Sequence, residues 1–364
     1  MPLTPEVRDL LALHMVPGLG PRLTAALLER FGSAAAVRQA TASELQSVPH
    51  IGPKLARDFH AALQTLDVDA EVAQLERFET SVLAMGQPGY PAALAEVASA
   101  PPLLYVRGGL LPTDTNAVAL VGSRHCTAYG RRVAERLAGD LARAGYTVIS
   151  GLARGIDGAA HRGALQAGGR TLAVLAGGLS RIYPPEHADL AREVQASGAL
   201  LTEATMMQQP LPEMFPARNR IISGLSRGVV IIEAAQQSGA LITARHALEQ
   251  GRDVFAVPGP VDSAASAGCL DLIRQGAKLV RGIDDLLEDL GGSVVTTAPT
   301  AATPPPGLDD TQRRVWEHLA GGVKHLDELA QQLELNVQQL SGALFALEMK
   351  KAVRRVPGGR YERT

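Results

Sequence analysis

Four arginines lie in or beside short turns that follow apolar, strand-like runs of the sequence. They are Arg124, Arg154, Arg218 and Arg220. In the first of these turns, Gly122 lets a backbone approach a ligand, Ser123 can cap a helix or donate a hydrogen bond, and Arg124 can bind a phosphate with two parallel hydrogen bonds. Where parallel strands end in such turns, backbone N–H groups and helix N-termini face anions. The pattern therefore predicts a phosphate-binding edge.

A second group of polar side chains lies further along the chain, after an aromatic residue. Arg218 and Arg220 flank Asn219 and follow Phe215. Arginines beside an aromatic ring suit a phosphate backbone with a stacked base, and we expect one of the two arginines to have a structural role instead. Ser238, Gly239 and Thr243 stand where a further helix is predicted to begin, so they could receive a phosphate there.

Three titratable side chains near these turns could do chemistry or hold structure. Glu233 could be a general acid or a group that holds the arginines in place, and the second role is the one we expect. Asp157 is expected to cap a helix whose same face carries His161, although a catalytic Asp–His pair is the alternative. No nucleophile stands beside them. The chain has no GxxxxGK[ST], no GxGxxG and no His/Cys cluster with metal spacing, so no ATP, NAD, other cofactor or metal is expected.

The elements that must position these residues alternate between strand and helix. The strand candidates are residues 117–122, 146–150, 171–176, 199–202, 229–233, 253–257 and 278–280. Helical patterns fill the gaps between them, and right-handed crossovers then follow. The fold class is therefore α/β, an extended Rossmann-like, doubly wound and mostly parallel sheet. A further strand is expected near 103–106, after a pair of prolines.

Segments on both sides of this sheet have their own patterns. Residues 1–64 are helical, and two similar Gly-Pro hairpins, Val16–Arg22 and Val48–Lys54, resemble tandem helix-hairpin-helix units. Such hairpins can contact DNA backbones, but a structural or protein-docking bundle is the reading that we favour for them. We assign residues 65–292 to the Rossmann-like domain and the proline-rich residues 293–308 to a linker.

Residues 309–364 read as a winged-helix domain. Three apolar helical stripes precede a predicted hairpin formed by 352–356 and the chain around Tyr361, with a Pro-Gly-Gly turn at 357–359. The end of the chain from Lys350 is rich in Lys and Arg, which suits phosphate contact. Docking of a protein partner is the alternative for this domain.

Bulk composition limits the class of protein. The 364 residues are 46% hydrophobic and 20% charged, with a formal net charge of -2, so any positive field must be local. The two cysteines are far apart and form no CxxC pair, which favours a reduced, cytoplasmic location. No apolar run is long enough to span a bilayer, so no membrane partner is expected.

Taken together, the ordered motifs of residues 80–290 resemble those of the DNA-processing protein A (DprA, also called Smf) family. The segments that carry the resemblance are YPAAL, LLYVRG, VGSRHCTAYG, SGLARGIDGAAHRGAL, TLAVLAGGLSRIYPPEH, LLTEA, FPARNRIISGLS, VVIIEAAQQSGALITARHALEQGRDVFAVPG and GCLDLIRQGAKLV. The helical N-terminal and winged C-terminal domains are also similar to appendages of that family.

The resemblance implies a non-enzymatic protein with no catalytic residues. It would bind and protect single-stranded DNA in a pocket of the Rossmann-like domain and help load the RecA recombinase during natural transformation. Family roles in DNA contact carry over to Arg124, Arg218 and Arg220. The family forms homodimers through a surface near residues 268–290, where the apolar candidates are Leu270, Leu272, Ile273 and Leu279. Some relatives place a lysine in the pocket that this chain lacks. The flanking domains could add contacts to double-stranded DNA.

Two other classes of function stay open at this point. A strand followed by a small-residue turn and a helix also resembles nucleoside-monophosphate phosphoribohydrolases, but the turn Gln237–Ala240 has no glutamate after it. A transcriptional regulator that reads duplex DNA with its winged helix is the other alternative. Release of adenine from AMP would indicate the first, and sequence-specific duplex binding the second.

Overall fold

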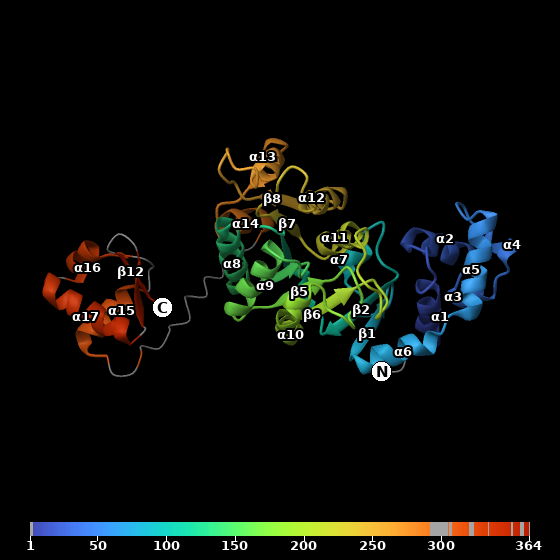
Figure 1. Ribbon diagram of the computed structural model, residues 1–364, viewed down its shortest axis with the longest axis horizontal. Helices are drawn as coiled ribbons and strands as arrows, with labels where there is room; N and C mark the ends of the chain where they lie inside the picture. Colours follow the sequence, from blue (N-terminus) through green and yellow to red (C-terminus); the bar gives the residue numbers. More distant parts are fainter. Residues whose placement is uncertain are drawn as a thin grey trace. The chain divides into compact units, whose positions relative to one another are not determined.

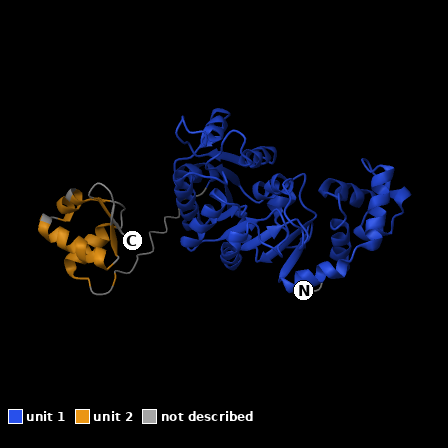
Figure 2. Cartoon of the chain, viewed as in Figure 1, with its two compact units in different colours: residues 1–295 blue, residues 296–364 orange. Residues whose placement is uncertain are grey.

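The computed structural model describes residues 3–291, 305, 308–319, 324–333, 335–350, 352–356 and 360–363. It separates into two compact units, residues 1–295 and 296–364 (Figure 2). Apart from positions 305 and 308, the linker predicted at 293–308 lies outside the described residues, and so does the turn predicted at 357–359. No helix of the described part is both long and apolar enough to cross a membrane.

The described part of the first unit contains a nine-stranded sheet in the order β1-β2-β6-β5-β4-β3-β7-β8-β9 (Figure 1). Strands β3 to β9 run parallel, whereas β2 is antiparallel to β6 and β1 is antiparallel to β2. The doubly wound, mostly parallel sheet is thus confirmed, and β1 is a strand that the sequence analysis did not expect. The strands are β1 (Thr80–Ala84), β2 (Leu103–Gly108), β3 (Ala117–Val121), β4 (Thr147–Ser150), β5 (Thr171–Val174), β6 (Ala199–Thr202), β7 (Gly228–Ile231), β8 (Asp253–Ala256) and β9 (Lys278–Leu279).

The central strands are apolar throughout because helices cover both faces of the sheet. All five residues of β3 are buried, and Ala119 lies between Ile149 of β4 and Val229 of β7. Side chains of Val118 and Leu120 join one core cluster, while Ala119 joins the cluster on the opposite face. This alternation fixes which residues of the following turns point along the sheet edge.

Two helical layers enclose the sheet (Figure 1). One face packs against α8 (Ala128–Arg143), α9 (Ile156–Gln166), α14 (Ile283–Leu290) and, over β5 and β6, α10 (Ala188–Ser197). The other face packs against α7 (Ala92–Ala95), α11 (Met214–Gly224), α12 (Ala240–Glu249) and α13 (Ala267–Arg274). Two short 3-10 helices are η1 (Pro112–Thr115) and η2 (Pro185–His187).

The N-terminal helices form a core of their own around Phe59 and Leu27. Each of the two predicted hairpins has a residue in the left-handed region, Gly18 at φ 81° and His50 at φ 68°. Gly20 and Gly52 then cap α2 and α5, and a proline opens each helix. The helices are α1 (Pro5–His14), α2 (Pro21–Phe31), α3 (Ala34–Gln39), α4 (Ala42–Leu45), α5 (Pro53–Thr65) and α6 (Val68–Arg77).

The second unit has the winged-helix plan that the sequence predicts. Three helices carry the expected apolar stripes and pack around Trp316, and the chain ends in a small antiparallel sheet. Its elements are α15 (Asp310–His318), β10 (Lys324–His325), α16 (Leu326–Leu333), α17 (Val337–Met349), β11 (Val353–Val356) and β12 (Arg360–Arg363).

Candidate functional site

The strand order places a crevice at the carboxyl ends of β3 and β7. Strands β4 to β6 extend to one side of β3 and strands β7 to β9 to the other, so the turns after β3 and β7 lead to helices on opposite faces of the sheet. A pocket of about 740 Å³ opens there. That volume lies within the range of small-molecule and cofactor sites, roughly 300–1,000 Å³. Its lining contains predicted site residues from two turns and two helices, α11 and α12: Gly122, Ser123, Arg124, Phe215, Arg218, Asn219, Ser238, Gly239 and Thr243.

Arg124 is the exposed cation of this pocket. Its guanidinium lies 4.5 Å from the centre of the Phe215 ring, and it pairs with no carboxylate of the described residues. The turn that carries it is rigid, because Ser123 donates its N–H to the Glu233 carbonyl at 2.7 Å and accepts from Ile156 N–H at 3.2 Å. A side chain at Gly155 would collide with the Ser123 carbonyl oxygen, which is 2.2 Å from the position of a Cβ atom. The tight turn therefore positions an arginine that is free to bind an anion.

Arg218 lies in the pocket wall with its charged group already engaged. The side chain is only 4% exposed and donates hydrogen bonds to the carbonyls of Gly151, at 2.8 Å, and Val174. Burial lowers its pKa to about 10, although Asp157 acts in the opposite direction. Because those carbonyls end β4 and β5, Arg218 ties α11 to the edge of the sheet.

Arg220 faces away from the pocket on the same helix. It is 8% exposed, forms an ion pair with Glu203 and does not line the cavity. We expected one of the two arginines of α11 to be structural, and the structure gives both of them partners within the chain. Asn219, between them, is half-buried, lines the pocket and donates from Nδ2 to the Gly239 carbonyl at 3.4 Å.

The N-terminus of α12 forms the opposite wall. Ser238 is half-buried, and its Oγ accepts from the Ala240 N–H at 3.3 Å, so this hydroxyl already caps the first turn. Gly239 is exposed, while Thr243 is 1% exposed and faces the pocket from one turn further along. These residues lie together as the sequence predicted, although whether they bind phosphate stays a prediction.

The Glu233 carboxylate pairs with no arginine of the described residues, so the expectation that it holds them directly is wrong. Its buried carboxylate accepts hydrogen bonds from Thr127 N–H at 2.9 Å and Thr127 Oγ1 at 2.5 Å. Thr127 is the N-cap of α8, so the acidic residue after β7 fixes the helix that follows β3. A negative charge is favourable there because the helix dipole is positive at this end. Gly130 makes room for it, since a Cβ atom there would lie 2.6 Å from Glu233 Oε2.

Asp157 is not an N-cap, because Gly155 occupies that position at φ 74° and Asp157 is already inside α9. Its carboxylate instead accepts from the N–H groups of Gly151 and Ala153, and burial raises its pKa although Arg218 opposes that shift. His161 is fully buried, with Nδ1 2.7 Å from Thr171 Oγ1. The residues of this pair therefore bind their own backbone and a neighbouring strand, rather than each other.

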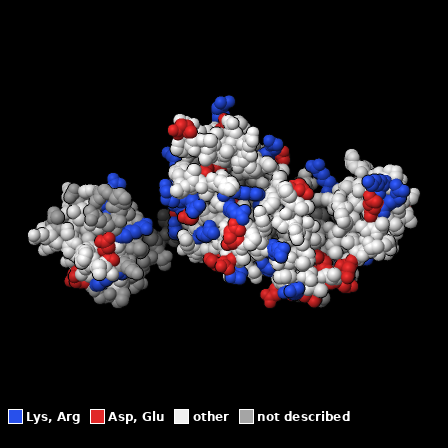
Figure 3. Space-filling view, viewed as in Figure 1, with Lys and Arg blue, Asp and Glu red and all other residues white. Residues whose placement is uncertain are grey.

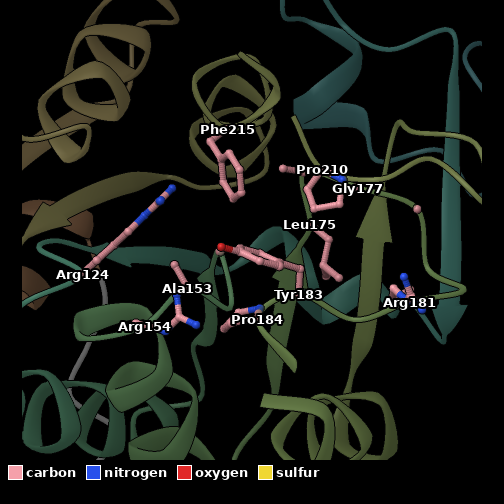
Figure 4. Close-up of a pocket in the computed structure, with 13 residues that line it drawn as sticks. Arg124, Ala153, Arg154, Leu175, Gly177, Arg181, Tyr183, Pro184, Pro210 and Phe215 are labelled. Atoms are coloured by element: carbon pink, nitrogen blue, oxygen red, sulfur yellow. The ribbon is translucent and has the colours of Figure 1, made fainter. Parts of the chain in front are cut away.

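Arg154 lies beyond the main pocket, beside a smaller hollow that shares Tyr183 with it (Figure 4). Arg154 is exposed, pairs with Glu186 and lies 6.0 Å from the Tyr183 ring centre. Tyr183 was not among the residues selected from the sequence, although the quoted segment RIYPPEH contains it. A strand followed by a long loop gave no spacing that would place this ring beside Phe215, which lies 32 positions later in the chain.

The residues predicted to form a dimer interface differ in exposure. Leu272 and Ile273 are half-buried and pack against the core of their own unit, and Leu270 is half-buried as well. Leu279, on the edge strand β9, is 43% exposed. An unpaired edge strand is a surface on which another chain can assemble.

On the face of the molecule that Figure 3 shows, the distribution of charged side chains does not mark another binding site. Figure 3 shows Lys and Arg groups interspersed with Asp and Glu groups there. Among the described residues no three His, Cys, Asp or Glu side chains group closely enough to hold a metal ion, and Cys126 and Cys269 are both free thiols.

Comparison with known proteins gives matches along the whole chain. Residues 81–291 match the family "DNA recombination-mediator protein A", residues 299–359 match the DprA winged helix domain, and residues 8–65 match a SAM-like helix-hairpin-helix tandem. Protein Smf of Synechocystis is 33% identical over 97% of this chain and 98% of its own length. Protein Smf of Escherichia coli is 40% identical over 80% of each chain.

Solved structures agree with these matches. DNA processing protein A from Streptococcus pneumoniae aligns with a TM-score of 0.69 and 34% identity, covering 79% of this chain and 99% of that one. The Helicobacter pylori protein, described for its single-stranded DNA binding mode, aligns with a TM-score of 0.53 and 30% identity over 58% of this chain and 96% of its own. Because the family match spans the sheet and its switch-point pocket, and the Synechocystis relative aligns over 97% of this chain, the chain belongs to the DprA (Smf) family.

Proposed function

We propose that this protein binds single-stranded DNA in the pocket between the ends of β3 and β7, without catalysing a reaction. The observation that carries the proposal is Arg124, an exposed guanidinium stacked 4.5 Å from the Phe215 ring in a pocket of about 740 Å³. A cation beside an aromatic ring can bind a phosphate while the ring stacks with a base, and this combination tolerates any base sequence. The single-stranded DNA binding described for the Helicobacter pylori relative supports it.

The pocket residues would have different roles because their side chains differ in burial. Arg124 and Asn219 would contact the strand directly, and Ser123 and Gly239 would add hydrogen bonds at the turn and at the helix N-terminus. Arg218 would contribute mainly by holding the pocket wall, because its side chain is buried and donates to backbone carbonyls. Arg220 would support α11 through Glu203 rather than touch DNA.

The carboxylates around the pocket argue against the phosphoribohydrolase alternative. Of the residues that line the described cavity, Asp157 alone has a carboxylate, and its oxygen accepts from two backbone N–H groups. Glu233 is occupied by Thr127. In the phosphoribohydrolases the phosphate-holding turn supplies a carboxylate, and the turn Gln237–Ala240 has none after it. Incubation with AMP should therefore release no adenine.

Binding to single and double strands under varied salt tests the proposal directly. Arg124→Ala should weaken single-strand affinity by roughly 1–3 kcal/mol and flatten the slope of log K against log salt by about 0.7, because one phosphate contact is lost. Arg132→Ala, an exposed arginine of α8 outside the pocket, is the matched control and should bind like wild type. Unchanged affinity for Arg124→Ala would refute the proposal, and sequence-specific duplex binding would favour a transcriptional regulator.

We further propose that the protein acts in natural transformation in the cytoplasm, as a homodimer that protects the incoming strand and helps load the RecA recombinase. Membership of the DprA family and the edge strand β9 support this. A strand-exchange assay with RecA on DNA coated by a single-strand-binding protein tests it. The protein should shorten the lag before strand exchange begins. An unchanged lag would refute the proposed role in loading the recombinase.

A further inference from the structure

A small hollow continues the main pocket on the far side of the Tyr183 ring. Both cavities share lining residues Arg124, Ala153, Tyr183, Pro210 and Phe215, so they form one continuous surface. The hollow measures only about 20 Å³, which is close to the room needed for a single water molecule. A nucleobase cannot enter it. Any base beyond the main pocket must therefore lie on the surface above it.

Two aromatic rings and two arginines lie next to one another along this surface. Phe215 and Tyr183 meet edge to face, with ring centres 5.9 Å apart at an interplanar angle of 63°. Arg124 lies over the first ring and Arg154 over the second. Tyr183 is 41% exposed, so one part of its ring stays open to solvent. A partly exposed aromatic side chain beside a bound strand can serve as a stacking platform.

The loop that carries Tyr183 is held in place by the residues that follow the ring. Pro184 is buried next to it, and His187, further along, lies with Nδ1 2.8 Å from the Leu152 carbonyl. Glu186, between them, pairs with Arg154. The platform is thus attached to the turn after β4, and stacking on it would cost little ordering of the chain.

Arg181 stands at the other end of the hollow from Arg124, with Tyr183 between them (Figure 4). Its side chain is exposed and forms no ion pair with any residue that the structure describes. The floor beneath is the Gly177-Gly178 turn, where a Cβ atom at Gly178 would lie 2.1 Å from the Thr205 carbonyl oxygen. A free guanidinium therefore lies beyond the platform, over a closely packed floor.

We propose that a second nucleotide subsite lies here: a base stacks on the exposed face of Tyr183 and the next phosphate binds Arg181. This subsite rests on the proposed binding of single-stranded DNA in the main pocket. The bound strand would then follow a path from Arg124 over Tyr183 to Arg181. A single strand fits because its bases are unpaired and can stack one at a time, whereas a duplex offers no free base to the ring.

Binding measured against oligothymidylates of increasing length, from about four to about twenty nucleotides, tests the subsite. Arg181→Ala should weaken binding about fivefold and lower the salt slope by about 0.7, but only for strands long enough to leave the main pocket. Tyr183→Ala should weaken binding about tenfold for long strands and less for short ones, because Tyr183 also lines the main pocket, and Tyr183→Phe should keep wild-type affinity because the ring remains. Arg124→Ala should weaken binding at every length.

Arg192→Ala is the matched control, since this arginine of α10 is exposed, pairs with Asp189 and with no other carboxylate that the structure describes, and lines neither cavity. The subsite would be refuted if Arg181→Ala and Tyr183→Ala both bound like wild type at every length while Arg124→Ala bound more weakly. That result would still support the main pocket as the binding site. An equal loss by Arg181→Ala at all lengths would also overturn the subsite, because Arg181 lines the hollow and not the main pocket. Normal binding by Arg124→Ala would instead refute the proposed function itself.

Discussion

Two arginines of the same pocket have opposite roles because they differ in burial. Arg124 is exposed and stacks on a ring, whereas Arg218 is 4% exposed and donates to two carbonyls. A charge that already has buried partners is a structural element, and its removal leaves those partners unsatisfied. An exposed charge without a carboxylate partner contributes little to folding and is available for a ligand.

We therefore expect Arg218→Ala to lower the free energy of unfolding by about 3–5 kcal/mol, since Asp157 would lose the neighbouring positive charge. Arg124→Ala should change the free energy of unfolding by less than about 0.5 kcal/mol. Urea unfolding of both variants provides the measurement. The division of roles would be wrong if the two variants unfolded at the same midpoint.

His161 makes stability depend on pH. The side chain is 0% exposed, and burial, with smaller contributions from nearby cations, lowers its pKa from 6.5 to about 3. Between these values the unfolded chain binds more protons than the folded chain, so stability is lost as the pH falls through that window. The loss approaches about 1.4 kcal/mol per pH unit. Urea unfolding at about pH 7.5 and about pH 5 should show a larger loss for wild type than for His161→Gln, and equal losses would contradict the assignment.

At the scale of elements, the carboxylate after β7 sets the start of the helix after β3. Glu233 binds the N-cap Thr127, and the Glu233 carbonyl accepts from Ser123 in the turn before it. The turn that carries Arg124 is thus held from the neighbouring strand. A pocket built from two adjacent turns keeps its shape when they brace each other.

Glu233→Ala should accordingly loosen the first turn of α8 and cost about 1–3 kcal/mol, because the Thr127 N–H would lose its acceptor. Hydrogen exchange of residues 127–131 should speed up, while Glu233→Gln, which keeps an acceptor oxygen, should show a smaller effect. Single-strand affinity should fall in the same order. Slow exchange in Glu233→Ala would show that the helix start does not depend on this contact.

For the whole molecule, the edge strand β9 is the surface where we place the homodimer. Leu279→Arg should give a monomer in sedimentation at concentrations where wild type is a dimer, because an unpaired charge would enter the interface. Leu279 is a better choice than Leu272, which packs against the core of its own unit. Val261→Arg, at a site 89% exposed, is the control. Identical sedimentation of all three proteins would place any interface elsewhere.

The second compact unit should add affinity without being the main site. Truncation after Gly292 leaves the first unit with its own cores and should keep single-strand binding measurable but weaker, while duplex binding falls further. Gel shifts with both substrates measure this. A truncated chain that binds neither would contradict the Rossmann pocket as the primary site, and undiminished binding to both would indicate a protein-docking role for the winged helix.

Local patterns in the sequence determined the elements of this fold. Runs such as Ala117–Val121 are continuously apolar because both faces of a parallel strand are buried, and the predicted central strands match the observed ones within one to two residues. The small-residue turns at strand ends also located Gly122–Arg124 and Ser238-Gly239 at one edge. The first strand, Thr80–Ala84, was missed because its half-buried antiparallel position gives no such run.

Only the tertiary structure decided which of the predicted residues face a ligand. Arg218 and Arg220 are two positions apart, yet one turns to the sheet carbonyls and the other to Glu203, since residues at that spacing lie on different sides of a helix. Thr127, the partner of Glu233, lies 106 positions away. Tyr183, between β5 and β6, contacts Phe215, which lies between β6 and β7. Burial and long-range pairing arise from how distant segments pack, so no local spacing could have assigned them.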